Sequence, residues 1–179
     1  MKVLYCSSEA VPFAASGGLG DVAGSLPKAL YDEGVDVRVV MPLYGQIKDK
    51  YGEQLEFVKS FEVSLGWRNQ YCGVFTLTKD GVVYYFIDNE YYFKRQGLYG
   101  HYDDGERFAY FSKAILEMLV NIDFTPDIIH TNDWQTALVT LYINVYYRHM
   151  PKFYNTKTVL TIHNIQYQGQ YGMDMVGGV

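Results

Sequence analysis

The feature that most constrains this fold is a strand–helix–strand pattern at the start of the chain. Residues 1–7 form an apolar run that predicts a buried strand, and residues 19–31 carry apolar side chains at helical spacing. Pro27 predicts a kink or an early end to that helix, Gly34 is placed to stop it, and residues 35–42 predict a second strand. A unit of this length is right-handed with parallel strands, so the sequence predicts an α/β fold.

The rest of the chain continues this pattern around an antiparallel insertion. Residues 54–65, 70–78 and 82–87 are rich in β-forming side chains, and Asp80-Gly81 before the third run is a hairpin signal. We expect the third run to return to the main sheet. Further elements are predicted as a ring-rich loop at 90–100, helices at 103–121 and 135–148, and buried strands at 126–130 and 157–162. Together they predict a mostly parallel sheet with a β-hairpin insertion.

Polar clusters follow four of the predicted strands. They are Ser8 to Asp21, Asn89 to Gly100, Thr131 to Gln135, and His163 to Gly169. In an open parallel sheet, the loops at the carboxyl ends of the strands line the binding crevice. The sequence therefore predicts a binding site at this edge of the sheet.

Charge and composition exclude several classes of function. The formal net charge is −5 and Lys and Arg do not cluster, which disfavours a nucleic-acid surface. No apolar run reaches the length of a membrane span and no signal peptide is evident, so a cytoplasmic protein is expected. Cys6 and Cys72 lack metal or disulfide spacing and are expected in the core. The 18 Tyr residues suit a sugar-binding surface, although many would be ordinary packing residues.

The sequence disfavours three familiar kinds of site. Gly18 to Ala23 formally matches the dinucleotide pattern, but it begins about ten residues after the strand and no acidic residue ends the second strand, at Met41-Pro42. His130 and His163 each follow a predicted strand, but no third metal ligand stands at a sensible spacing. A hydrolase is disfavoured too, because the nucleophile elbow G-x-S-x-G is absent.

Several candidate site residues also have purely structural interpretations. Asp21 lies in the first turn of a predicted helix, where a carboxylate complements the helix dipole. Asp133 is placed to cap the helix that follows it. Trp134 and Phe93 are suited to the core. His130 and His163 could each be an ordinary core or loop residue whose ring nitrogens are hydrogen-bonded. These alternatives stay open on the residues alone.

Taken in order along the chain, a set of short motifs resembles the N-terminal domain of the ADP-glucose-dependent bacterial glycogen synthases and plant starch synthases. The matching stretches are Ser8-Glu9 with Pro12-Phe13, Gly17 to Val22, Leu26 to Leu30, Val39 to Tyr44, Asp133 to Leu138, and Thr161 to Asn164 with Gln168-Gly169. Each motif is weak by itself, but together they span nearly the whole chain and are very specific.

The resemblance implies an architecture and an activity. Members of the family have two facing Rossmann-like domains, the GT-B arrangement, with the active site between them. They are hexosyltransferases of glycogen biosynthesis that move glucose from ADP-glucose to the 4-hydroxyl at the non-reducing end of an α-1,4-glucan. The anomeric configuration is retained, without a metal or cofactor. Residues 1–179 would be the three-layer, glucan-side domain, a fragment that lacks the C-terminal nucleotide-binding domain and is inactive alone.

The resemblance also implies roles for single residues. His163 would steady the developing charge on the transferred glucose, and Asp133 would orient that glucose. Gly17 and Gly18 would bring backbone N–H groups to the donor. The acceptor glucan or maltooligosaccharide would contact Asp21, Trp134, Gln135, Asn164 and Phe93.

The chain departs from the family pattern at two positions. Ala15 stands where the family usually has a donor-binding lysine, and Asn132 replaces a histidine. The loss of a cation opposite a diphosphate leaves two alternatives open: a transferase that uses another nucleotide sugar such as UDP-glucose, or a non-catalytic glucan-binding module.

Overall fold

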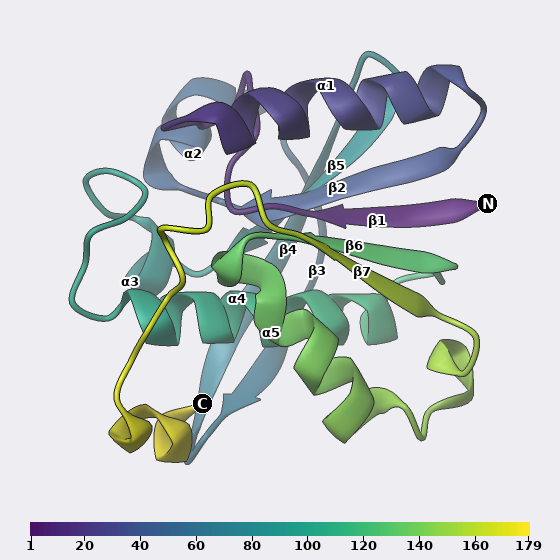
Figure 1. Cartoon of the computed structure of the whole chain (residues 1–179). Coiled ribbons are helices and arrows are strands. Elements are labelled where there is room, and N and C mark those ends of the chain that lie inside the picture. The colour runs from purple at the N-terminus through teal and green to yellow at the C-terminus, as the bar shows by residue number, and fades with distance from the viewer.

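The strands of the chain form one seven-stranded sheet in the order β3-β4-β5-β2-β1-β6-β7 (Figure 1). This computed structural model describes residues 1–179. The strands are β1 (Lys2–Cys6), β2 (Asp36–Pro42), β3 (Glu56–Leu65), β4 (Arg68–Lys79), β5 (Val82–Asp88), β6 (Ile128–Asn132) and β7 (Lys157–Thr161).

The parallel part of the sheet is built on β1 at its centre. β1 pairs in parallel with β2 and β6, so that Tyr5 lies opposite Val39 on one side and His130 on the other. β5 extends the parallel sheet beyond β2, and β7 extends it beyond β6. Four of the five residues of β1 are buried, as a strand covered on both faces requires. The predicted strand–helix–strand unit is confirmed.

The predicted hairpin insertion is confirmed as well. β3 pairs antiparallel with β4, and β4 pairs antiparallel with β5. The turn residues Asp80 and Gly81 have φ values of 52° and 83°, the left-handed backbone that a tight hairpin turn uses. β5 then joins the main sheet beside β2, as expected from the sequence.

Helices cover both faces of the sheet and make three layers (Figure 1). α1 (Gly18–Asp32) and α2 (Gly45–Tyr51) lie on one face, and α4 (Asp104–Asn121) and α5 (Trp134–Tyr142) lie on the other. One cluster of 43 buried residues, Cys6 and Cys72 among them, joins the sheet to these helices. The prediction of a Rossmann-like, three-layer domain is therefore confirmed.

Several predicted boundaries are wrong, each for a local reason. Pro27 does not end α1, which continues to Asp32 with the proline ring buried against the sheet. The predicted helix 135–148 is α5 followed by a π-helical turn, Ile143–Tyr147. Part of the predicted loop after β5 is a short helix, α3 (Glu90–Phe93), whose N-cap Asn89 accepts a hydrogen bond from the Tyr92 N–H. α2 was not predicted.

Two predictions about β6 and β7 also need correction. β6 runs to Asn132, so His130, Thr131 and Asn132 lie within the strand and do not follow it. β7 was expected to be buried, but it is the edge strand, and Val159 and Leu160 are exposed. An apolar run therefore predicted the strand correctly but not its exposure.

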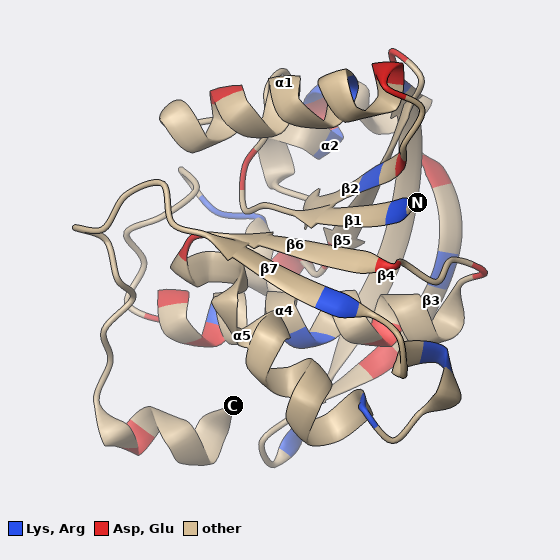
Figure 2. Cartoon of the chain, turned by 45° about the vertical axis from the view of Figure 1, so that its right-hand side comes forward, with Lys and Arg blue, Asp and Glu red and all other residues tan.

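The charged residues are dispersed over the surface. In the view of Figure 2, Lys and Arg are interspersed with Asp and Glu along the chain. No helix of the chain is long and apolar enough to cross a membrane.

Candidate functional site

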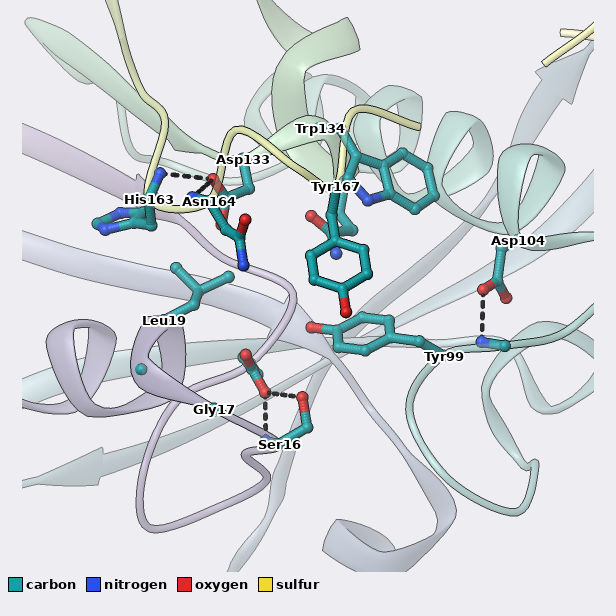
Figure 3. Close-up of a pocket in the computed structure, with 14 residues that line it drawn as sticks. Ser16, Gly17, Leu19, Tyr99, Asp104, Asp133, Trp134, His163, Asn164 and Tyr167 are labelled. Atoms are coloured by element: carbon teal, nitrogen blue, oxygen red, sulfur yellow. Dashed lines mark hydrogen bonds between the residues drawn. The ribbon is translucent and has the colours of Figure 1, made fainter. Parts of the chain in front are cut away.

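The main pocket of the molecule lies at the carboxyl ends of β1, β6 and β7, the sheet edge that the polar clusters predicted. Its volume is about 920 Å³. It is lined by Glu9, Ser16, Gly17, Gly18, Leu19, Tyr99, Gly100, Asp104, Asp133, Trp134, Gln135, His163, Asn164 and Tyr167 (Figure 3). All four polar clusters contribute residues to the lining of this pocket. The topology therefore brings together residues that are far apart in sequence.

The glycine-rich loop between β1 and α1 forms one side of the pocket. It ends in the first turn of α1, whose leading N–H groups have no acceptor within the helix. The carboxylate of Glu9 holds this loop in place, since its Oε2 accepts hydrogen bonds from the backbone N–H and the hydroxyl of Ser16. Burial raises the pKa of Glu9, and the nearby Asp133 adds to the shift. The loop thus presents backbone donors beside a buried carboxyl group.

Asp133 connects the end of β6 to the loop that follows β7. Its Oδ1 accepts the N–H of His163 at 2.7 Å and the N–H of Asn164 at 3.3 Å. Asp133 occupies the N-cap position of α5, but its side chain makes no capping bond there. Its φ is 56°, which residues with side chains seldom adopt. The capping interpretation is therefore wrong, because the carboxylate organises the next pocket loop instead.

Asn132 fixes the imidazole of His163. Its amide nitrogen donates to the Cys6 carbonyl at 3.0 Å, which leaves its Oδ1 to face the His163 Nε2 at 2.8 Å. The hydroxyl of Tyr5 donates to the same oxygen at 3.0 Å. Because this oxygen only accepts, Nε2 of His163 carries the proton and Nδ1 remains an acceptor when the ring is neutral. Asparagine at position 132 therefore sets the tautomer of His163.

Aromatic rings form the opposite side of the pocket. The Trp134 ring packs edge-on against Phe108, with ring centroids 5.3 Å apart, and lies 5.8 Å from the ring of Tyr171. Figure 3 shows the hydroxyl groups of Tyr99 and Tyr167 pointing toward each other below this tryptophan. Rings with polar tips can pack on the C–H face of a sugar while bonding its hydroxyls.

Most of the predicted site residues meet in this pocket. Gly17, Gly18, Asp133, Trp134, Gln135, His163 and Asn164 line it. Ala15 and Asp21 are exposed near it but are not part of its lining. Phe93 is fully buried in the core against Tyr44 and Phe111, so its prediction as an acceptor-contacting ring is corrected.

Seven lining residues were not predicted as site residues. They are Glu9, Ser16, Leu19, Tyr99, Gly100, Asp104 and Tyr167. Six of them lie inside the polar clusters that follow the strands, and only Asp104 lies outside these clusters. The clusters therefore predicted which loops form the pocket. They did not predict which side chains point into it, because tertiary contacts determine the orientation of each side chain.

His130, which lies beside the pocket, gives a prediction about how the stability of the fold depends on pH. Burial lowers the pKa of His130 below its ordinary value of 6.5, and the nearby His163 lowers it further. The unfolded chain therefore binds the extra proton first as the pH falls. We expect the free energy of unfolding to decrease from pH 6.5 down through the folded pKa, and His130→Gln to remove that part of the slope. Denaturant unfolding at several pH values measures this, and an NMR titration of His130 with a pKa above 6.5 would contradict it.

Comparisons with known proteins place the chain in a family. Residues 2–179 match the family described as the starch synthase catalytic domain. A glycogen synthase of Caldicellulosiruptor saccharolyticus is 54% identical over 176 residues, 98% of this chain and 37% of that relative. One of Exiguobacterium sibiricum is 52% identical over 180 residues, 99% of this chain and 37% of the relative.

A solved structure agrees with these relatives. The catalytic domain of starch synthase IV from Arabidopsis thaliana, bound to ADP and acarbose, superposes with a TM-score of 0.87 at 31% identity. The match covers 98% of this chain and 36% of that one. This chain therefore spans a little over a third of the length of the proteins it matches, and it belongs to the starch synthase catalytic domain family.

Proposed function

We propose that this chain is the N-terminal, glucan-side domain of a glycogen synthase. The complete enzyme would be a hexosyltransferase that moves glucose from ADP-glucose to the non-reducing 4-hydroxyl of an α-1,4-glucan, with retention of configuration. Two glycogen synthases at 52–54% identity over almost the whole chain support the activity. The related starch synthase bound to ADP and acarbose supports the classes of ligand.

One observation carries the proposal: the pocket places a helix N-terminus opposite carboxylate, imidazole and aromatic side chains. Gly17 and Gly18 stand at the first turn of α1, and the free N–H groups and dipole of a helix N-terminus favour an anion. We assign this side to the diphosphate and sugar of the donor. Neither glycine has an atom within 4 Å of where a Cβ would stand, so the backbone is open to close approach by a ligand.

The side formed by Asp133 and His163 is assigned to the reacting glucose. A retaining transfer without a protein nucleophile depends on positioning and on stabilising the positive charge that develops on the sugar. Asp133 supplies negative charge, and it orients His163 by accepting a hydrogen bond from the backbone N–H of His163. His163, with Nε2 bound to Asn132, offers Nδ1 and its carbonyl to the sugar. Trp134, Gln135 and Asn164 would contact the acceptor, with Asp21 near the pocket mouth.

Several parts of the proposal concern what lies outside the pocket. A second, nucleotide-binding domain would face this one and complete the site, so residues 1–179 alone would be inactive. The reaction would need neither metal nor cofactor. A cytoplasmic location also stays a prediction.

The decisive experiment titrates a full-length protein containing this domain with ADP-glucose and UDP-glucose, then measures glucose transfer to glycogen. We expect binding of ADP-glucose and glucan extension. Preference for UDP-glucose would support the alternative transferase. Binding of maltoheptaose without any turnover would support the glucan-binding module and contradict the proposal.

The alanine at position 15 gives a gain-of-function prediction. Ala15 is exposed beside the glycine turn, and its methyl group packs so closely on Gly20 that a Cβ at Gly20 would lie 2.4 Å away. A lysine at 15 places a cation near the proposed diphosphate site. We expect Ala15→Lys to tighten binding of ADP-glucose about tenfold, less at high salt.

The matched control is Ala29→Lys, which adds the same charge at an exposed position far along α1. Isothermal titration of the full-length variants with ADP-glucose compares the two. Equal affinities for Ala15→Lys and the control would place the diphosphate elsewhere.

A further inference from the structure

A fully buried arginine stands behind the aromatic side of the pocket. Arg107, in α4, has no exposed surface and lies between two rings, with its guanidinium carbon 5.7 Å from the centre of Phe93 and 5.3 Å from that of Phe108. Its Nη1 forms an ion pair with Oδ1 of Asp104 at 2.6 Å. A buried charge is tolerated only where it is paired and hydrogen-bonded, so the pair calls for a structural reason.

The ion pair holds the backbone that precedes α4 through three hydrogen bonds. Nη1 of Arg107 donates to the Leu98 carbonyl at 3.1 Å, and Nε donates to the Tyr92 carbonyl at 2.7 Å. On the other side, Oδ2 of Asp104 accepts the Gly100 N–H at 2.7 Å. Leu98 and Gly100 flank Tyr99 in the chain. The two members of the ion pair therefore hold the backbone immediately before and immediately after this tyrosine.

Tyr99 is the pocket residue whose backbone this ion pair holds in place. Its hydroxyl lies 2.6 Å from the Ser8 hydroxyl, next to the glycine-rich loop, and its ring lies 5.7 Å from Phe108. Phe108 in turn supports Trp134. Figure 3 shows the Tyr99 ring crossing the floor of the pocket, with Asp104 bonded to the backbone beside it. Asp104 lines the pocket, and each of its carboxylate oxygens accepts one of these bonds, so the carboxylate ties the Gly100 backbone to Arg107.

We propose that Arg107 and Asp104 are positioning residues that fix Tyr99 for sugar binding, an inference that rests on the proposed function. Their role in this proposal is to hold the loop. The ion pair converts a loop with a left-handed glycine, Gly100 at a φ of 89°, into a rigid support for one ring. Loss of the pair leaves Tyr99 present but mobile, and glucan affinity falls because the ring must be ordered on binding.

The test uses Asp104→Asn and Arg107→Lys in a full-length protein. A neighbouring ion pair offers a matched control: Arg95 binds Asp103 through two hydrogen bonds, of 3.1 and 2.9 Å, in the same loop but without touching the backbone around Tyr99. We expect Asp104→Asn to weaken maltoheptaose binding about tenfold. Arg107→Lys should weaken it to a similar extent, because a single ammonium cannot replace the bonds of both Nε and Nη1. Asp103→Asn should change it less than about twofold.

Two readouts separate positioning from general stability. In a double-mutant cycle, Asp104→Asn should add little to the loss caused by Tyr99→Ala, because the first acts through the second. Amide hydrogen exchange at Gly100, resolved by fragmentation mass spectrometry, should accelerate in Asp104→Asn but not in Asp103→Asn. The exchange measurement needs no ligand. A wild-type protein that binds no glucan would overturn the proposed function, while the exchange result still tests the grip on the loop.

The inference is overturned by any of three results. These are additive losses in the cycle, an equal loss of affinity in Asp103→Asn, or unchanged exchange at Gly100 in Asp104→Asn. A structure of Asp104→Asn with Tyr99 held in its wild-type place would have the same meaning.

Discussion

Replacing Asp133 by Ala should lower the rate of glucose transfer by the full-length enzyme about 10²–10³-fold, the size of effect seen when one charge-stabilising group is removed. The change removes a carboxylate from the pocket wall. It also leaves the N–H groups of His163 and Asn164 without their shared acceptor, so the loop after β7 loses its geometry. Initial rates of glucose incorporation into glycogen measure the effect.

Asp133→Asn is the matched control that separates charge from geometry. The Asn side-chain oxygen can accept the same two N–H groups, so the loop should keep its shape while the negative charge is gone. We expect a smaller loss in ligand binding for Asp133→Asn than for Asp133→Ala, but a similar loss in rate. An Asp133→Ala enzyme within about threefold of wild type would contradict the role given to this carboxylate.

Phe93→Ala should give the largest loss of stability, about 3–5 kcal/mol in the free energy of unfolding. The ring has no exposed surface and packs against Tyr44, Tyr110 and Phe111, and the guanidinium of Arg107 lies over it. Truncation leaves a cavity that this dense cluster of rings and a buried charge cannot readily fill. Urea unfolding of the variant and the wild type gives the difference.

Trp67→Ala provides the comparison, because it removes a larger ring that is 83% exposed at the tip of the β3–β4 hairpin. We expect a change within about 0.5 kcal/mol there. If Phe93→Ala instead weakened glucan binding while stability stayed intact, the ring would belong to the site and its buried position would be wrong.

The sequence was sufficient for the succession of the strands along the chain, for the parallel pairing of β1 with β2 and for the antiparallel hairpin. Alternation and apolar runs predicted the strands, and Asp80-Gly81 predicted the hairpin because few residues adopt that backbone at low cost. The site edge followed from topology, since the carboxyl ends of parallel strands share one edge. The exposure of β7 did not follow, because an apolar run cannot show which neighbours the strand will have.

The site was predicted at the level of loops and only partly at the level of side chains. Asp133 and His163 were identified as site residues. The hydrogen bond from the His163 N–H to the Asp133 carboxylate depends on a left-handed backbone at Asp133, which no sequence pattern predicts. Phe93 was misplaced because a four-residue helix, α3, turns its ring inward. Tyr99 was missed because the contacts around it, such as the hydrogen bond between its hydroxyl and that of Ser8, are tertiary and leave no sequence pattern.

The central position of β1 has a consequence for how the protein acquires its site. Tyr5 of this strand bonds Asn132, 127 residues later, and the pocket walls come from residues 9 to 167. Such long-range closure makes folding slow, because the entropy of closing long loops is lost before the contacts form. Ligand-binding competence should therefore appear only in the last kinetic phase of refolding, together with the complete sheet, and a bound glucan would report on assembly of the entire domain.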